Sequence, residues 1–173
     1  MKTKEEIGEI YFKTVAMITY LIERVQTYRE QVGKTAIQKL MFLLERGLKN
    51  DFDFRFHYYG PYSSFIDSEL NYASFLHSVN IKWVDNRGYF ITKGENASTF
   101  TKILSAEEKR EIETVVEQYG NLSAKELSII ATAYYLKKYS RIDGKELIQA
   151  VRILKRYEEE PIQKLLEEYG VLE

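Results

Sequence analysis

The chain has 173 residues, no cysteine and a formal net charge of −1. The lack of cysteine excludes disulfides, thiolate nucleophiles and cysteine metal sites. The near-zero net charge argues against a surface coated with positive charge for non-specific nucleic-acid binding. The N-terminus shows no signal-peptide pattern, and the longest apolar patch, residues 15–22, is too short to cross a bilayer. We therefore expect a cytoplasmic protein without a membrane span.

The helix starts are marked by capping boxes, in which a polar N-cap residue is followed three residues later by Glu or Gln. Such a pair satisfies two backbone donors that the first helical turn leaves unpaired. The pattern occurs at Thr3/Glu6, Thr35/Gln38, Ser105/Glu108 and Ser123/Glu126, with Asp143/Glu146 as a looser version. Together with the apolar periodicity, it predicts helices over about 4–28, 35–48, 106–118, 124–139, 144–157 and 161–169.

Two β-rich stretches lie between the second of these helices and the C-terminal ones. Aromatic residues alternate with polar residues over 52–58, which predicts a strand. Gly60 permits a sharp turn, and Pro61 suits a position at or just before a helix start. We expect Ser63 or Ser64 to cap a helix that ends near residue 77. The segments 81–84 and 89–92 flank turn residues and predict a β-hairpin.

This order of elements predicts a mainly α fold with a small β-hairpin. We expect a winged-helix-like N-terminal core over about 4–94, extended by a C-terminal helical part over about 105–173. The broad apolar faces of the C-terminal helices indicate that both parts form a single domain over 1–173. Those faces suit either the core or a homo-oligomer contact, and the residues concerned are Leu147, Val151, Leu154, Ile162 and Leu165.

Three motifs that suggest chemistry have the wrong spacing. Gly33-Lys34-Thr35 has the ending of a phosphate-binding loop, but Tyr28 occupies the position where that loop needs its first glycine. His57 and His77 lie on different predicted elements and lack a carboxylate at metal-ligand spacing. The Gly-x-Ser-x-Gly frame of a nucleophilic serine is absent around Ser63. We therefore predict a non-enzymatic protein with no catalytic residue, no metal and no cofactor.

The run Tyr58-Tyr59-Gly60-Pro61-Tyr62-Ser63 is the strongest candidate for a binding surface, and we name it the tyrosine corner. Three tyrosines around a turn supply flat, stiff surfaces with polar tips, which suit the recognition of a partner protein. The alternative is structural: the aromatic residues anchor a strand-to-helix corner while Gly60 and Pro61 set the backbone.

A family resemblance rests on this run and on the helix before it. Gln38-Lys39-Leu40 followed by aromatic residues and Tyr59-Gly60-Pro61 resembles the Panacea (SocA-like) antitoxin domain and the related YwgA-type uncharacterised proteins. The helix over 123–139, with Glu126-Leu127 and Ala131, is also similar, so the resemblance covers about residues 30–140. It implies a helix-rich antitoxin or regulator that binds a protein, such as a toxin. We expect this chain to bind its partner through the tyrosine corner, together with Gln38 and Lys39. Tyr62-Ser63 is closer to the YwgA-type pattern, whose role is open.

The alternative function is that of a winged-helix transcriptional regulator that binds double-stranded DNA. The helix after Pro61 argues against it, because no Lys or Arg occurs between Phe56 and Ile81 while Asp67 and Glu69 would face the phosphates. Cations do lie on neighbouring elements, and those that suit DNA contact are Lys34, Lys82, Arg87 and Lys93. Arg87, at the tip of the predicted hairpin, is the best single candidate, with a solvated turn residue as the alternative interpretation.

Overall fold

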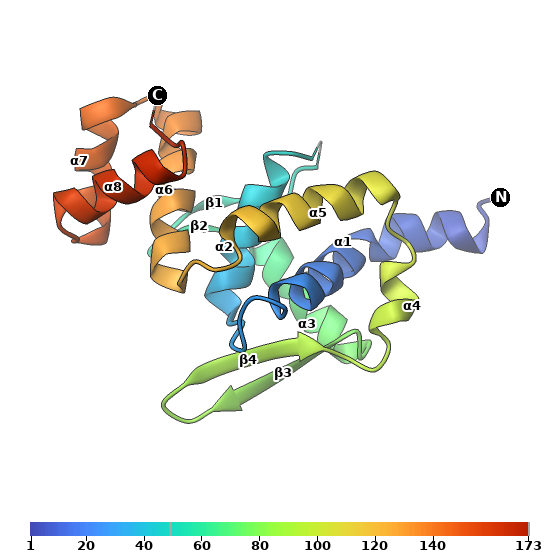
Figure 1. Cartoon of the computed structure of the whole chain (residues 1–173). Coiled ribbons are helices and arrows are strands. Elements are labelled where there is room, and N and C mark those ends of the chain that lie inside the picture. Colours follow the sequence, from blue (N-terminus) through green and yellow to red (C-terminus); the bar gives the residue numbers. More distant parts are fainter. Residues whose placement is uncertain (49, 173) are drawn as a thin grey trace.

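A computed structural model describes residues 1–48 and 50–172 (Figure 1). Over these residues the fold is mainly helical with two short antiparallel hairpins, which confirms the predicted fold class of a mainly α protein with a small β-hairpin. The helices are α1 (Lys4–Val25), α2 (Lys34–Glu45), α3 (Ser64–Phe75), α4 (Ala97–Thr101), α5 (Ala106–Tyr119), α6 (Ala124–Ser140), α7 (Gly144–Lys155) and α8 (Glu159–Glu168). The strands are β1 (Arg55–His57), β2 (Gly60–Tyr62), β3 (Val79–Val84) and β4 (Gly88–Lys93).

Helix α2 lies at the centre of the core, where every residue over 36–44 is buried. Helices α1, α3, α5 and α6 and strand β2 all pack against it. Apolar residues from both halves of the chain, from Val15 to Val171, join in one hydrophobic cluster around it. A helix buried on all sides is normally apolar all round. Gln38 and Lys39 break that rule, since both are polar and both are buried.

The predicted hairpin over 81–92 is confirmed and is slightly longer, since β3 and β4 pair from Val79↔Lys93 to Val84↔Gly88. Figure 1 shows its tip projecting from the helical body. Strand β4 and the turn before it are held by the connection between α1 and α2. The Ile91 N–H donates to Val32 O at 2.9 Å, and Gln31 Nε2 donates to Arg87 O at 2.6 Å. The hairpin is therefore anchored to the body by one backbone hydrogen bond and one side-chain hydrogen bond.

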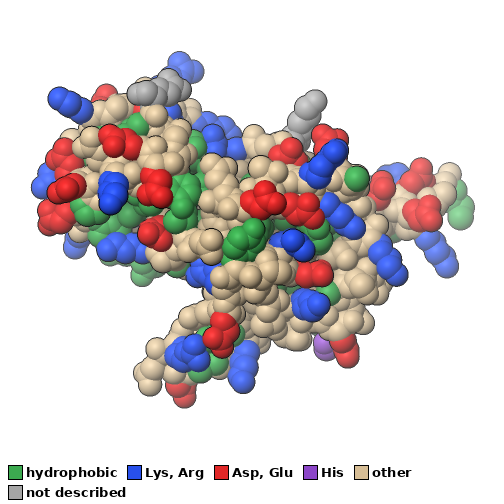
Figure 2. Space-filling view, viewed as in Figure 1, with side chains coloured by type: hydrophobic (Ala, Val, Ile, Leu, Met, Phe, Trp, Pro, Cys, Tyr) green, Lys and Arg blue, Asp and Glu red, His purple; other side chains and the backbone are tan. Residues whose placement is uncertain are grey.

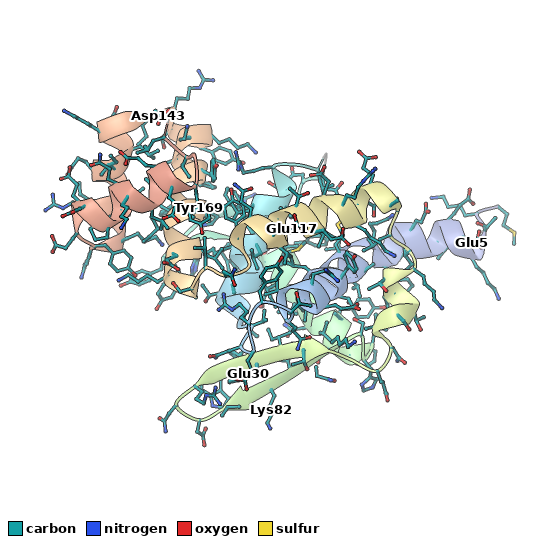
Figure 3. The ribbon with its side chains drawn as sticks, in the orientation of Figure 1. Glu5, Glu30, Lys82, Glu117, Asp143 and Tyr169 are labelled. Atoms are coloured by element: carbon teal, nitrogen blue, oxygen red, sulfur yellow. The ribbon has the colours of Figure 1, made fainter. Side chains whose placement is uncertain are left out.

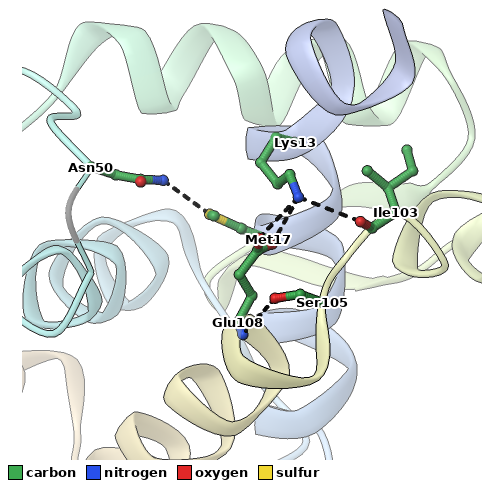
Figure 4. A network of polar contacts seen from close by, with 6 residues as sticks. All are labelled: Lys13, Met17, Asn50, Ile103, Ser105 and Glu108. Atoms are coloured by element: carbon green, nitrogen blue, oxygen red, sulfur yellow. Dashed lines mark hydrogen bonds and ion pairs between the residues drawn. The ribbon is translucent and has the colours of Figure 1, made fainter. Parts of the chain in front are cut away.

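Two predicted capping boxes are complete, at Thr3/Glu6 and at Ser123/Glu126. At the start of α5, Ser105 caps the Glu108 N–H, but the Glu108 carboxylate pairs instead with Lys13 of α1 at 2.9 Å (Figure 4). This pair joins α5 to α1. The capping box predicted at Thr35/Gln38 is wrong. Helix α2 begins at Lys34, its N-cap is Gly33, and no side chain caps it.

The chain around the tyrosine corner differs from the sequence prediction. The strand expected over 52–58 is reduced to β1, because Asp53 has a φ of +52° and interrupts the extended backbone. Phe52 and Phe54 are buried, whereas Phe56 is exposed. Pro61 does not start a helix but lies in β2, paired with Phe56. Ser63 caps α3 as expected, and its Oγ accepts the Ile66 N–H at 3.1 Å.

Helices α6, α7 and α8 form a lobe at one end of the molecule, and α6 connects it to α2 and β2 (Figure 1). Leu147, Val151 and Ile162 are fully buried in the core, so this part of the apolar surface serves folding. Leu154 remains exposed. Basic and acidic side chains are interspersed on the face shown in Figure 2, without a broad field of one sign. No helix in the described part of the chain has the length and apolarity needed to span a membrane.

Candidate binding site

The tyrosine corner is a β-hairpin that lies against α2 and α6. Strands β1 and β2 pair from Arg55↔Tyr62 to His57↔Gly60, which leaves Tyr58 and Tyr59 at the turn. These two side chains are 78% and 66% exposed, and their rings meet edge to face at 4.9 Å. Gly60 has a φ of +100°, a left-handed conformation that side chains disfavour. The hairpin therefore presents its turn to solvent and its second strand to the core.

The structure divides the predicted interaction residues into two groups. Tyr58 and Tyr59 are exposed, and Tyr62 is half-buried. The other five are buried and cannot touch a partner at the surface without rearrangement. They are Gly60, Pro61, Ser63, Gln38 and Lys39.

Two hydrogen bonds of the Gln38 side chain attach the tyrosine corner to α2. Its Nε2 donates to Ser63 O and its Oε1 accepts the Ser63 N–H, both at 2.9 Å. The Ser63 hydroxyl donates in turn to Phe52 O. All of these atoms are buried, so each bond satisfies a polar group that would otherwise be costly. The role of Gln38 in this structure is to hold the corner.

Lys39, the next residue, is only 2% exposed. Its ammonium donates to Pro61 O at 2.7 Å. No carboxylate of the described residues forms an ion pair with it. Burial, and then the neighbouring charge of Lys155, lower the pKa of Lys39 to about 7. A lysine in this position costs stability when it is charged.

Lys155, at the end of α7, approaches the same place from the other side. Its ammonium donates to Ser128 Oγ at 2.6 Å, and Ser128 donates to Tyr59 O at 2.7 Å. Burial lowers the pKa of Lys155 to about 8. It too forms no ion pair with a carboxylate in the described part of the chain. Two lysines without countercharges thus flank the backbone of Tyr59 and Gly60.

Thr132 completes the group. It lies four residues after Ser128, on the same face of α6, and it is fully buried with an Oγ1 that has no hydrogen-bond partner among the described residues. A Cβ built on Gly60 would lie 2.5 Å from Thr132 Oγ1, 3.3 Å from Lys155 Nζ and 3.8 Å from Lys39 Nζ. These polar atoms therefore fill the space beside Gly60 that a side chain would occupy. We name Lys39, Gly60, Ser128, Thr132 and Lys155 the lysine cradle.

Two hollows open beside the tyrosine corner and reach the cradle. The larger, of about 790 Å³, is lined by Lys155 and Ser128 and also by Phe56, Tyr58, Tyr59, Lys125, Ile153, Leu154, Arg156 and Tyr157. The smaller, of about 330 Å³, is lined by Lys39 and Gly60 and also by Lys34, Tyr62 and Asp67. Thr35, His57 and Tyr59 line both. Asp67 is the one carboxylate among the described residues that line either hollow, and it pairs with Lys34 at 3.9 Å.

The contact between Lys155 and Ser128 has the composition of a base and a nucleophile. Its hydrogen bonds favour a structural link instead, since the serine accepts from the ammonium and donates to a backbone carbonyl. Ser128 also lies within a regular helix rather than at an exposed turn. Within residues 1–48 and 50–172, no group of three or more His, Asp or Glu side chains is arranged to hold a metal ion.

The predicted DNA-contact residues gather at the β3–β4 hairpin. Lys82 and Lys93 are exposed on its strands, and Lys82 points away from the body (Figure 3). Arg87 at the turn lies over the Phe90 ring at 4.6 Å. Lys34 is less available, because it lies 4.7 Å from the centre of the Tyr89 ring and pairs with Asp67.

Ser128, Thr132 and Lys155 were not identified from the sequence, and they lie on α6 and α7, far along the chain from the tyrosine corner. One signal was present in α2, where the polar residues Gln38 and Lys39 interrupt an apolar run. A second was present in α6, where two hydroxyl residues four positions apart interrupt an apolar run.

The chain matches no protein-family model and no curated protein, so the functional argument depends on the fold and on this site.

Proposed function

We propose that the chain is a non-enzymatic, antitoxin-like regulator that binds an acidic, partly apolar segment of a partner protein in the larger hollow. The observation that carries the proposal is the lining of this hollow. It combines aromatic and aliphatic side chains with Lys125, Lys155 and Arg156, and it includes no carboxylate among the described residues. Such a surface complements a peptide that carries both apolar side chains and negative charge.

The exposed aromatic residues support a protein partner. Tyr58, Tyr59 and Phe56 line the hollow from the β1–β2 hairpin, while Ile153 and Leu154 line it from α7, and all five are exposed. Rigid aromatic side chains lose little conformational entropy on binding and are common among residues that dominate interface energies. Following the family resemblance, we place this function in the cytoplasm, with a toxin as the partner class.

The proposal is tested by selecting peptides from a random library on the purified protein and then measuring the affinity of the enriched sequences. We expect enrichment of Asp or Glu next to aromatic or aliphatic residues, with binding that weakens as salt rises. Replacing a tyrosine that dominates an interface by alanine costs about 2 kcal/mol or more, so Tyr59→Ala should weaken binding about tenfold or more. Tyr11→Ala is the matched control, because Tyr11 is 68% exposed but lies on α1. Equal binding by both variants, or enrichment of basic peptides, would overturn the proposal.

A second candidate function, duplex DNA binding, is favoured by the projecting β3–β4 hairpin. The succession of α1, α2, α3 and this hairpin, with Val32 bonded to Ile91, supports a winged-helix-like interpretation of the core. Asp67 and Glu69 on α3 oppose it, because a reading helix with carboxylates would be repelled by the phosphates. Retention on duplex DNA that falls with salt and is lost in Arg87→Ala would favour this function. Retention that Arg87→Ala leaves unchanged would count against it.

A further inference from the structure

We propose that the β3–β4 hairpin binds single-stranded nucleic acid, with an unpaired base stacked on Trp83 and the phosphates held by the lysine and arginine side chains of the hairpin. This inference goes beyond the two functions above, since it involves neither the larger hollow nor a duplex. It stands on two observations, which are an exposed aromatic plane that is held in place and an excess of unpaired cations beside it.

Trp83 supplies the aromatic plane. It is the one tryptophan in the sequence, and it is 59% exposed. It lies on β3 directly opposite Tyr89, and the two rings meet edge to face at 4.9 Å. The indole Nε1–H donates to the Asp85 carboxylate at 3.1 Å. Because these contacts orient the ring before a ligand arrives, a base that stacks on Trp83 orders little that is not already ordered.

The position of Trp83 on its strand shows that the core does not need it. Val79 and Trp83 share one face of β3 with Ile91 and Tyr89 of β4, because the side chains alternate along each strand. Val79 and Ile91 are buried, whereas Trp83 lies beyond them, where the hairpin projects from the body (Figure 1). A large aromatic side chain left outside the core is typical of a surface that binds something.

The charged side chains of the hairpin are mostly basic. Residues 79–93 contain Lys82, Arg87 and Lys93 against one carboxylate, Asp85, which accepts from Trp83. All three cations are exposed, and none forms an ion pair with a described residue. The near-zero net charge of the whole chain opposes a broad coating of nucleic acid, but the local excess at the hairpin still attracts phosphates.

Cations and aromatic rings are also neighbours on both faces of the hairpin. On one face, Lys82 is paired across the strands with Phe90, and Arg87 lies over the Phe90 ring at 4.6 Å. On the other face, the Lys34 ammonium lies 4.7 Å from the centre of the Tyr89 ring, next to Trp83. Proteins that hold single strands combine these two elements, since bases stack on the rings while cations follow the backbone.

The same features favour a single strand over a duplex. Bases in a duplex are already stacked and paired, so placing one on Trp83 would require unstacking. A duplex read by α3 would also bring Asp67 and Glu69 close to its phosphates. A single strand can follow the projecting hairpin without approaching α3.

The first experiment measures the fluorescence of Trp83, which reports the proposed contact without interference from another tryptophan. The full chain is titrated with an oligothymidylate of about 12 nucleotides. We expect saturable quenching with a Kd of about 10 μM that weakens as salt rises. The duplex of this oligonucleotide with oligoadenylate should bind about tenfold more weakly, and equal affinity would overturn the proposal. Oligouridylate in the same assay distinguishes RNA from DNA, and binding of either strand supports the proposal.

Variants of Trp83 test the stacking contact, with the anisotropy of a fluorescein-labelled oligothymidylate as the measurement. Loss of one stacked base should weaken binding about tenfold in Trp83→Ala. Trp83→Phe keeps an aromatic plane and should stay within about threefold of wild type. Tyr139→Ala is the matched control, because Tyr139 is 54% exposed but lies on α6. Unchanged affinity in Trp83→Ala, or an equal loss in Tyr139→Ala, would overturn the proposal.

Variants of the cations test the phosphate contacts. Lys82→Gln and Arg87→Gln should each reduce the slope of log affinity against log salt by about 0.7, the value for one phosphate contact with a single strand. Lys164→Gln is the control, since Lys164 is exposed on α8, and it should leave the slope unchanged. An unchanged slope in both hairpin variants would overturn the proposal. Failure of the peptide selection, with oligonucleotide binding intact, would refute only the antitoxin-like function.

Discussion

Replacing Lys39 by methionine tests the energetic cost of the buried charge. Methionine has a similar length and is suited to an apolar position. In the folded protein the pKa of Lys39 is lowered from 10.5 to about 7, mainly by burial. This difference corresponds to roughly 4–5 kcal/mol of penalty on the charged form. The lost hydrogen bond to Pro61 O offsets about 1–3 kcal/mol of it in the variant.

The direction in which the stability changes with pH follows from proton binding. Between the folded pKa of about 7 and the unfolded value of 10.5, the unfolded state binds more protons, so wild-type stability rises with pH in that window. Below about pH 7 both states are protonated and the penalty is complete. We therefore expect Lys39→Met to be about 2–3 kcal/mol more stable than wild type at pH 6, with the gap closing by about 2–3 kcal/mol at pH 9.

Urea denaturation of both proteins at pH 6, 7, 8 and 9, in a buffer without phosphate or sulfate, measures the gap directly. Lys82→Met is the control, because Lys82 is exposed on β3 and its replacement should shift stability little at any of these pH values. The other charged side chains and the histidine that line the two hollows are Lys155, Lys34, His57, Asp67, Lys125 and Arg156. They are present in all three proteins. Parallel stability curves for wild type and Lys39→Met would refute the reasoning.

Two further predictions concern the β1–β2 hairpin and its attachment to α2. Gly60→Ala should lower the free energy of unfolding by about 2–4 kcal/mol in urea denaturation, since the added Cβ would lie 2.5 Å from Thr132 Oγ1 at a φ of +100°. Gly144→Ala is its control and should cost about 1 kcal/mol, because Gly144 has a φ of +56° and no atom within 4 Å of the added Cβ. Equal losses in the two variants would contradict the contact between residue 60 and Thr132. Gln38→Leu should cost about 1–3 kcal/mol and speed amide exchange at Ser63, because it leaves the buried Ser63 N–H without a partner. The Ser63 C=O keeps its bond from the Asp67 N–H. The exposed Gln163→Leu is its control, and unchanged exchange at Ser63 would refute the role assigned to Gln38.

The helices could be predicted from the sequence because their signals are local. A cap and its partner lie three residues apart, so Thr3/Glu6 and Ser123/Glu126 form the same bonds in the structure that the pattern predicts. Thr35/Gln38 is the exception, because the partner of Gln38 is not local. Gln38 pairs with Ser63, 25 residues away, and a buried pair of bonds outweighs an exposed cap.

The sequence predicts the tyrosine corner as a run of residues, but it does not distinguish the exposed side chains of the corner from the buried ones. Alternation over 52–58 predicted one aromatic face, whereas the left-handed Asp53 ends that regularity and leaves Phe56 exposed. The lysine cradle could not be predicted from the sequence, because its members come from α2, β2, α6 and α7. Only the packing of these elements brings Lys39 and Lys155 together.

The cradle combines several features that each weaken the fold. Two lysines lie close together without countercharges in the described structure, and the Thr132 hydroxyl is buried without a partner. A sequence under selection for stability alone would be expected to replace them with apolar residues, since such substitutions are readily found. Departures from local consistency are typical of functional or strained sites, so the cost of Lys39 is a reason to test it for a role in function.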